Sequence, residues 1–414
     1  MFETLMENPY YNEVVKFLKA RKLSEKSYLV GGSVRDVLIG QELKDLDFAI
    51  ASDAVKLAKD FSKEIGGSFV LLDDVFSIGR IVKNHITIDF SELRGGSIEA
   101  DLRERDFTIN AMASDLSLER IIDPFKGLTD IKNKIIRMVN EENLKADPLR
   151  ILRAYRFHAT LGFNIDKETR KALIRNAHLM KVTAKERIKE EIWKILSVEN
   201  SFRTIEIITE DDIFSSIFTS SGLLKAQPDM TALKIIEKIL KKPEEFLSSE
   251  NVIQKVYSLP ALKFTCLFGF YAPSFIQQLK PSKKVVRFTE KLVDAGVKIR
   301  KIETLIDKVR FIRDFENIFY PAIVYGISKN PLGLAKAWFY KEIENFYRKV
   351  YLKNKKKLPI IKGEDILSMG FEPSPVVGEI IETIETLVLA GKISTKKQAI
   401  EEIKKRYLLK ISLP

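Results

Sequence analysis

Short apolar runs recur along the chain between residues 28 and 139. Most of them are rich in β-branched and aromatic residues and are bounded by turn-forming residues, a pattern typical of strands. Residues 54–64 instead repeat apolar positions every three or four residues, as an amphipathic helix does. This part of the chain is therefore predicted to be a mixed α/β unit, with strands at 28–31, 46–51, 68–72, 78–82 and 86–90.

Beyond about residue 141 the strand pattern disappears. Apolar residues then recur at helical spacing, for example at 148–161, 185–196 and 233–240. We therefore expect an α+β protein, in which a mixed sheet is followed by helices alone. A chain of 414 residues exceeds one ordinary hydrophobic core. We divide it into residues 1–139, 140–200, 201–310 and 311–414.

Composition adds limits to this picture. With 45% hydrophobic and 30% charged residues the chain can bury a substantial core. Its single cysteine, Cys266, excludes an internal disulfide, and one cysteine with three histidines cannot build a Cys/His zinc site. The N-terminus lacks the basic and apolar regions of a signal peptide, and Lys263 interrupts the apolar stretch 259–275. We expect a cytoplasmic protein without a membrane span.

Charge is distributed unevenly along the chain. Residues 1–140 carry a net charge of −3. Because the whole chain carries +12, residues 141–414 carry +15. Such an excess of lysine and arginine favours binding to a polyanion, because it releases counterions condensed on phosphates. The expected partner surface therefore lies in the C-terminal part.

A glycine turn follows the first predicted strand. Gly31 and Gly32 allow close backbone approach to a triphosphate, and the N-terminus of the next predicted helix directs amide hydrogens toward it. Arg35 adds a charge-assisted phosphate contact. A Gly-Gly turn alone is weak evidence for such a site.

Acidic residues follow on the next predicted strand. Asp45 and Asp47 are two positions apart, so both carboxylates point to the same face. Magnesium prefers carboxylate and phosphate oxygens, and two ions can activate a hydroxyl while neutralising a leaving pyrophosphate. Asp89, in a neighbouring predicted strand, is our candidate for a third carboxylate, with Glu92 as the weaker choice.

Taken with later segments, these residues resemble the class II tRNA nucleotidyltransferase and bacterial poly(A) polymerase family. The resemblance follows the chain motif by motif over about 28–200 and returns more loosely at 361–405. It implies a polymerase-β-like nucleotidyltransferase head with a mixed sheet, followed by an all-helical neck, body and tRNA-binding tail. The segments that carry it are 31–36 with 45–47 (the first motif), 103–113 (the second), 123–130 (the third, which joins head and neck in relatives), 147–156 (the fourth) and 185–196 (the fifth, whose Glu186 and Arg187 would brace the neck helix).

The resemblance also implies roles for single residues. Arg105 would contact the nucleotide, and Asp106 and Asn110 would recognise its ribose. Asp147 and Arg150 would present hydrogen-bond partners to the incoming base, so that protein replaces a nucleic-acid template. Further phosphate and nucleotide contacts would come from Arg153 and Arg156.

Two features qualify these expectations. Relatives often carry glutamate before the aspartate of the fourth motif, but the residue here is Ala146. Taken alone, 109–113 would be predicted as a helix packed on the sheet.

Within the family, the nucleotides that an enzyme adds depend in part on a loop between the first and second motifs. Relatives that add the terminal A have a longer loop there, whereas here Gly95, Gly96 and Ser97 alone separate the strand segment from a helix-like run. We therefore favour a CC-adding enzyme with two Mg²⁺ ions, acting on CTP and on the immature 3′ end of tRNA. A full CCA-adding enzyme, which would also use ATP, is the alternative. An A-adding enzyme or poly(A) polymerase comes next, and a non-catalytic RNA-binding protein last. No obligate protein partner is indicated.

Overall fold

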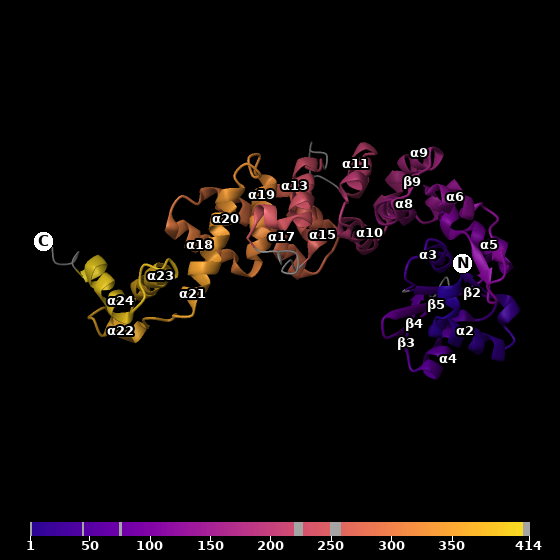
Figure 1. Ribbon diagram of the computed structural model, residues 1–414, viewed down its shortest axis with the longest axis horizontal. Coiled ribbons are helices and arrows are strands. Elements are labelled where there is room, and N and C mark those ends of the chain that lie inside the picture. Colours follow the sequence, from indigo (N-terminus) through magenta and orange to yellow (C-terminus); the bar gives the residue numbers. More distant parts are fainter. Residues whose placement is uncertain (1, 44, 74–76, 219–226, 249–257, 409–414) are drawn as a thin grey trace. The chain divides into compact units, whose positions relative to one another are not determined.

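The computed structural model describes residues 2–43, 45–73, 77–218, 227–248 and 258–408. The chain packs into two compact units. The first comprises Met1–Glu191 and Asp211–Ile217, and the second Ile192–Glu210 and Phe218–Pro414. The first unit contains the sheet, and the described part of the second is helical (Figure 1). The α+β class is confirmed, whereas the division into four parts stays a prediction.

The first unit is built on a seven-stranded mixed sheet. Its strand order is β3-β4-β5-β2-β1-β6-β7, in which β2 and β5 are parallel and the other neighbours antiparallel. The strands are β1 (Ser27–Val30), β2 (Asp45–Ile50), β3 (Ser68–Asp73), β4 (Ile78–Lys83), β5 (Ile86–Glu92), β6 (Ala113–Asp115) and β7 (Ile121–Ile122).

The first five strands lie within two residues of the ranges predicted from sequence. The short strands β6 and β7 were not predicted, because they are too short to show a period of their own. Residues 109–113 do not form the helix that they would predict in isolation. Instead a 3₁₀ turn at Thr108–Asn110 leads into β6, which hydrogen-bonds to β1. Sheet pairing thus outweighs local propensity there.

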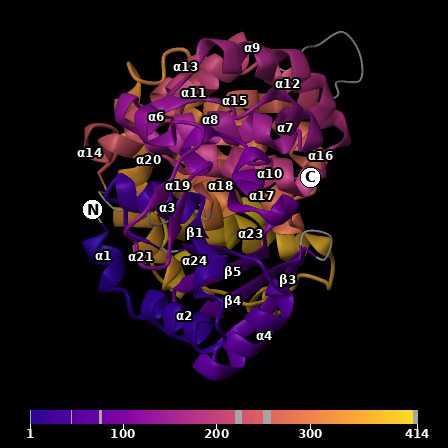
Figure 2. The same cartoon turned by 90° about the vertical axis from the view of Figure 1, so that its right-hand side faces the viewer.

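Helices α2 (Pro9–Ala20) and α4 (Ala54–Ile65) cover one face of this sheet (Figure 2). Helix α4 begins where the Asp53 carboxylate accepts from the Lys56 amide and ends at a left-handed glycine, both ordinary helix boundaries. Buried Phe17 and Phe61 meet between the two helices, with ring centroids 4.8 Å apart. This apolar packing turns Leu46 and its alternate neighbours inward and leaves the aspartates of β2 on the other face.

The helices that follow the sheet in sequence form a bundle within the first unit. The buried Tyr155 hydroxyl donates to Asp211 at 2.7 Å, and Arg170 pairs with the same carboxylate at 2.8 Å, which ties residue 211 to this bundle. A two-stranded parallel pair, absent from the prediction, joins Ile135–Ile136 to Asn164–Ile165. The other helices of the unit are α1 (Glu3–Met6), α3 (Gly32–Leu38), α5 (Ile98–Arg103), α6 (Gly127–Asn133), α7 (Glu141–Ala146), α8 (Leu149–Leu161), α9 (Lys167–Asn176), α10 (Lys185–Ser197, which continues into the second unit) and α12 (Ile213–Ile217).

The second unit contains a fully buried lysine in its core. Lys263 donates to the Glu237 carboxylate at 2.8 Å and to the Val198 carbonyl at 2.7 Å. Its α-helices are α11 (Phe202–Glu210), α13 (Met230–Lys241), α14 (Pro243–Phe246), α15 (Leu259–Phe268), α16 (Ala272–Gln278), α17 (Lys283–Lys298), α18 (Leu305–Phe315), α19 (Phe319–Lys329), α20 (Ala337–Phe346), α21 (Leu352–Lys355), α22 (Gly363–Leu367), α23 (Pro375–Leu389) and α24 (Lys396–Ile403).

One apolar helical run in the described residues, Leu259–Gln278, has the length and composition of a membrane span. However, 67% of its most apolar window is buried inside the protein, as expected for a core helix. Its hydrophobicity is therefore explained by packing.

Candidate active site

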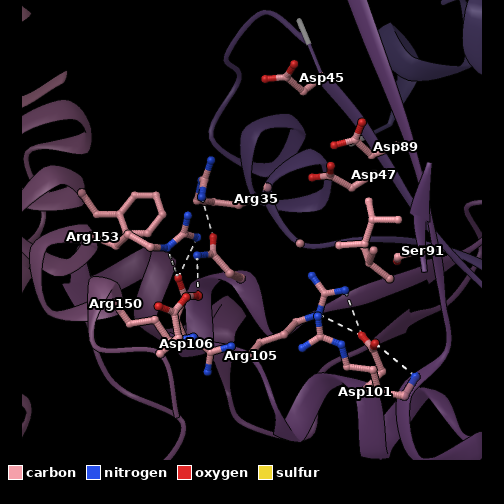
Figure 3. A pocket seen from close by; sticks show the side chains of 18 of the residues that line it. Arg35, Asp45, Asp47, Asp89, Ser91, Asp101, Arg105, Asp106, Arg150 and Arg153 are labelled. Atoms are coloured by element: carbon pink, nitrogen blue, oxygen red, sulfur yellow. Dashed lines mark hydrogen bonds and ion pairs between the residues drawn. The ribbon is translucent and has the colours of Figure 1, made fainter. Parts of the chain in front are cut away.

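A cavity of about 430 Å³ opens on the acidic face of the sheet and is bordered by the helices that follow it (Figure 3). Its lining contains every site residue predicted from sequence, although their functional roles remain predictions. They are Gly31, Gly32, Arg35, Asp45, Asp47, Asp89, Arg105, Asp106, Asn110, Asp147, Arg150, Arg153 and Arg156.

The glycine turn is shaped by one neighbouring side chain. Gly31 has a φ of +67°, and a Cβ atom there would lie 2.5 Å from Nη1 of Arg105. A side chain at this position would therefore strain the backbone and displace the arginine. At Gly32 the nearest contacts of such an atom would be an ordinary 3.5 Å. The structure thus requires glycine at residue 31 and not at residue 32.

Three carboxylates gather on β2 and β5. The parallel register places Asp47 directly opposite Asp89, and Asp45 lies two residues earlier on β2, opposite Thr87. The Ser33 hydroxyl accepts from the Asp47 amide at 2.7 Å and donates to the Asp45 carbonyl at 3.1 Å, which links α3 to the strand. Burial, together with the charges of Asp89 and Asp45, raises the pKa of Asp47 to about 6 despite the opposing effect of Arg105. The site thus carries uncompensated negative charge.

The third carboxylate is engaged by a residue that the sequence did not single out. Arg80 of β4 donates from Nε and Nη2 to the two Asp89 oxygens, at 2.8 and 2.7 Å. Glu92, the weaker candidate, is exposed and is not among the lining residues. Arg80 could have been found only from the pairing of β4 with β5.

Arg105 is held by a second residue that sequence reasoning missed. Its Nε and Nη2 donate to one oxygen of Asp101, at 3.0 and 2.8 Å (Figure 3). Asp101 is buried, with 3% of its surface exposed. The spacing of four residues was a signal for this ion pair, but it is equally typical of exposed helix faces.

Asp106 is the centre of a hydrogen-bond network. Its carboxylate accepts from the Asn110 amide at 2.9 Å and from Nε of Arg153 at 2.8 Å. Burial opposes its ionisation, but Arg153 and Asn110 outweigh that effect and hold the pKa of Asp106 well below its usual range. Arg35 donates in turn to the Asn110 carbonyl oxygen. Asp106 is therefore a fixed negative charge.

The residues expected to read the base lie where α7 meets α8. Asp147 has extended backbone and accepts from Nη2 of Arg187 at 3.0 Å. Arg150 donates to the Asn143 carbonyl at 3.2 Å. Ala146 is the exposed last residue of α7. Arg187, expected from the resemblance to brace this region, is thus in contact with the predicted base-reading aspartate.

A buried aromatic ring supports the arginines on this side of the cavity. The guanidinium carbons of Arg156, Arg35 and Arg153 lie 4.0, 5.0 and 5.5 Å from the Phe157 ring centroid. Arg156 also forms an ion pair with buried Glu191 at 2.7 Å. Phe157 has no signal of its own in the sequence, because an apolar helix position predicts only core packing.

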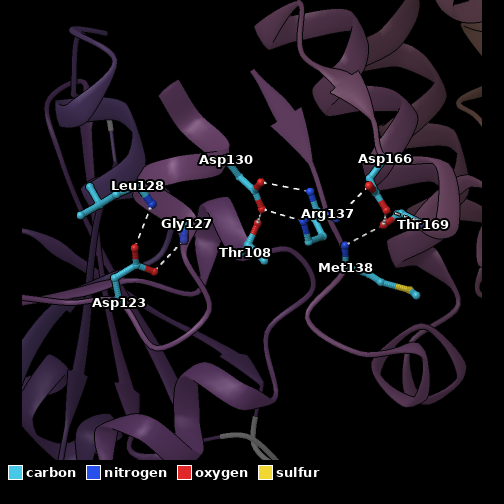
Figure 4. Close-up of polar contacts among 9 residues, drawn as sticks. All are labelled: Thr108, Asp123, Gly127, Leu128, Asp130, Arg137, Met138, Asp166 and Thr169. Carbon is cyan, nitrogen blue, oxygen red and sulfur yellow. Dashed lines mark hydrogen bonds and ion pairs between the residues drawn. The ribbon is translucent and has the colours of Figure 1, made fainter. Parts of the chain in front are cut away.

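A polar network joins the sheet to the helices within the first unit (Figure 4). Asp130 accepts from the Thr108 hydroxyl at 2.7 Å and from Nε of Arg137 at 3.1 Å, and Arg137 also donates to Asp166 at 2.8 Å. Asp123 caps α6 by accepting from two of its first amides. This segment is the third motif, expected from the resemblance to join head and neck.

Three family models match successive parts of the chain. The poly A polymerase head domain matches residues 27–137, and the probable RNA and SrmB-binding site of polymerase A matches 162–223. A putative tRNA nucleotidyltransferase domain 2 matches 261–403. Together the three matches cover most of the chain, one after another.

Whole-length relatives agree with these matches. The CC-adding tRNA nucleotidyltransferase of Synechocystis sp. is 29% identical over 393 residues, covering 91% of this chain and 93% of that protein. The CCA-adding enzyme of Ligilactobacillus salivarius is 29% identical, covering 94% and 95%. The solved Thermotoga maritima CCA-adding enzyme complexed with tRNA shares the fold, with a TM-score of 0.73, 21% identity and coverage of 98% and 96%. The chain therefore belongs to the tRNA nucleotidyltransferase and poly(A) polymerase family of nucleotidyltransferase enzymes.

Proposed function

We propose that this chain is a tRNA 3′-terminal nucleotidyltransferase that adds cytidine monophosphate residues without a template and releases pyrophosphate. The observation that carries the proposal is that one cavity combines the carboxylates of β2 with Asp147 and Arg150, which lie where α7 meets α8. Its relatives are named as CC-adding and CCA-adding enzymes. The cytoplasm is the compartment that we assign to this activity.

Membership of the family implies use of a divalent metal ion, and the residues present fit one. Asp45 and Asp47 offer hard oxygen ligands on one face, and the raised pKa of Asp47 reflects charge that a cation would neutralise. Within the described ranges no three acidic, histidine or cysteine side chains form a ready ligand group, and Asp89 is hydrogen-bonded to Arg80. We assign Asp45 and Asp47 to two Mg²⁺ ions, which when bound would activate the 3′-hydroxyl and neutralise the leaving pyrophosphate.

The protein's own groups would position the reactants. The Gly31 turn, Arg35 and Arg105 would hold the triphosphate, because guanidinium groups and backbone amides suit phosphate oxygens. The 3′-oxygen would attack the α-phosphorus in line as the bond to pyrophosphate breaks. We assign Asp89 as the acceptor of the hydroxyl proton. Fixed charges in a preorganised cavity would supply most of the catalysis.

Selection of the nucleotide would fall to the helical side of the cavity. Asp106 and Asn110, both buried and already oriented by Arg153 and Arg35, would face the ribose. Asp147 and Arg150 would pair with the edge of the base, so that their spacing acts as the template. Arg150→Ala should therefore relax the choice between CTP and ATP.

The preference for CC addition rests on a short connection. Strand β5 ends at Glu92 and α5 begins at Ile98, and the link between them is tightly folded, since a Cβ at Gly95 would lie 2.6 Å from the Ala100 side chain. This connection therefore lacks the longer loop that the resemblance associates with a switch to ATP. A full CCA-adding enzyme is the alternative, supported by the relative from Ligilactobacillus salivarius.

The tRNA body would bind the second unit. The basic segment 348–357 contains six lysines and arginines and no acidic residue, and all six basic side chains are exposed. One of them, Lys355, pairs with Glu316 at 2.7 Å. Reversing charges in this segment should weaken tRNA binding and reduce its salt dependence, because fewer counterions would be released. A salt response unchanged by such reversals would exclude this surface.

The deciding experiment is incorporation of labelled CTP or ATP, separately and together, with Mg²⁺. The substrates are tRNA transcripts that end before CCA, after the first C, and after CC. Extension by CTP that stops after CC would establish the CC-adding function, and ATP addition after CC would establish the CCA-adding alternative. Long A tracts would indicate a poly(A) polymerase, and no incorporation would leave an RNA-binding protein. Asp45→Asn is the matched inactive control.

A further inference from the structure

We propose that Arg80 is a positioning residue that binds both carboxylate oxygens of Asp89 in the free protein, and thereby weakens divalent-cation binding by Asp89, Asp45 and Asp47. The inference rests on the proposed function, because it assumes that Asp45 and Asp47 bind the metal ion. It assigns a role in this site to a residue that no sequence motif contains.

Strand register brings the charges together. Arg80 of β4 lies directly opposite Asp89 of β5, and Asp89 lies directly opposite Asp47 of β2. Residues opposite each other in a sheet project from the same face, so one row across three strands reads Arg80, Asp89, Asp47. The arginine therefore stands at the end of the carboxylate row.

The contact between Arg80 and Asp89 occupies both carboxylate oxygens. Two parallel hydrogen bonds of 2.8 and 2.7 Å form the bidentate arrangement that suits arginine and carboxylate. The Asp89 side chain is 17% exposed and that of Arg80 35%, so the pair is only partly screened by water. A metal ion that uses an Asp89 oxygen must share that oxygen with an arginine N–H group and approach the positive charge of the guanidinium.

Asp45 and Asp47 differ from Asp89 in their partners. Within the described residues neither forms an ion pair, and Asp45 accepts instead from the Thr87 hydroxyl. Both carboxylates nevertheless interact with Arg80 through their charge. The pKa of Arg80 is raised chiefly by the hydrogen bond to Asp89, and further by the negative charges of Asp89, Asp45 and Asp47. Arg80 thus reduces the net negative charge of the three carboxylates and competes for the oxygens of Asp89, and both effects oppose cation binding.

Direct titration with Mn²⁺, without nucleotide or tRNA, tests this role. The unbound ion is measured by its electron paramagnetic resonance signal. Replacing Arg80 with methionine should tighten binding by about threefold to fivefold, the scale of a partly exposed ion pair. Arg94→Met removes from the same cavity a positive charge that pairs with Glu104, and it should change binding much less. Asp45→Asn should abolish the titrated site.

A double-mutant cycle distinguishes positioning from simple charge. In an Asp89→Asn background, Arg80→Met should bring little or no gain, because the pair no longer exists. An equal gain in both backgrounds would show that Arg80 acts through its charge alone and would overturn the proposal. Unchanged or weaker Mn²⁺ binding by Arg80→Met, in protein with wild-type circular dichroism, would overturn it as well.

Kinetics provide a second readout. With saturating metal, Arg80→Met should lower kcat, since Asp89 loses its orientation, and leave the KM for CTP nearly unchanged. A large rise in that KM with unaltered Mn²⁺ binding would make Arg80 a phosphate contact instead. The titration requires no tRNA, so failure of the wild-type protein to extend tRNA would refute the proposed function without deciding the role of Arg80.

Discussion

Asp47 should make the stability of the metal-free protein depend on pH. Its pKa is raised from 3.8 to about 6, chiefly by burial and then by the neighbouring carboxylates. A shift of about two units corresponds to about 3 kcal/mol, at 1.36 kcal/mol per unit. Because the folded protein holds this proton more tightly than the unfolded chain, the contribution is fully present below about pH 4. It is lost as the pH rises through about 6.

The variant Asp47→Asn isolates this effect from all other titrating groups. It stays neutral at every pH, so the free energy of unfolding of the variant minus that of the wild type should grow between pH 4 and pH 7. The upper limit of the gain is about 3 kcal/mol. Saturating Mg²⁺ should remove most of it, because a bound cation compensates the ionised carboxylate in the wild type alone.

Urea unfolding followed by circular dichroism is the suitable assay. Both tryptophans, Trp193 and Trp338, belong to the second unit, so tryptophan fluorescence would miss the unfolding of the first. A difference between variant and wild type that stays constant from pH 4 to pH 7 would refute the reasoning. So would a pH-dependent difference that persists unchanged in saturating Mg²⁺.

Two further predictions follow from close contacts. Gly31→Ala should lower kcat/KM for CTP at least about tenfold, because positive φ costs about 1–2 kcal/mol and the new Cβ displaces Arg105, whereas Gly32→Ala should be far milder. Similar kinetics for the two variants would contradict the requirement for glycine at residue 31 alone. Lys263→Met should destabilise the second unit by about 3 kcal/mol, since it leaves the Glu237 carboxylate, only 10% exposed, without its partner. In a urea-unfolding cycle, adding Glu237→Gln should cost less than the sum of the two single changes, and strict additivity would disprove the coupling.

Much of the first unit follows from local pattern. Alternation along β2 separates Leu46 and Phe48, which enter the core, from Asp45 and Asp47, which face the cavity. This separation depends only on the two-residue repeat of an extended backbone, so the sequence shows it directly. The same holds for α8, whose helical period brings Arg150 toward the cavity.

The tertiary structure alone decided which side chains surround those residues. Arg80 reaches Asp89 because β4 pairs with β5 in one particular register, and Asp89 reaches Asp47 because β5 pairs with β2. Phe157 supports three arginines only once α8 packs beside the glycine turn. Periodicity is a local property of the backbone and can be read from a single segment. Strand order and register depend instead on how the whole core packs, and no short stretch of sequence contains that information.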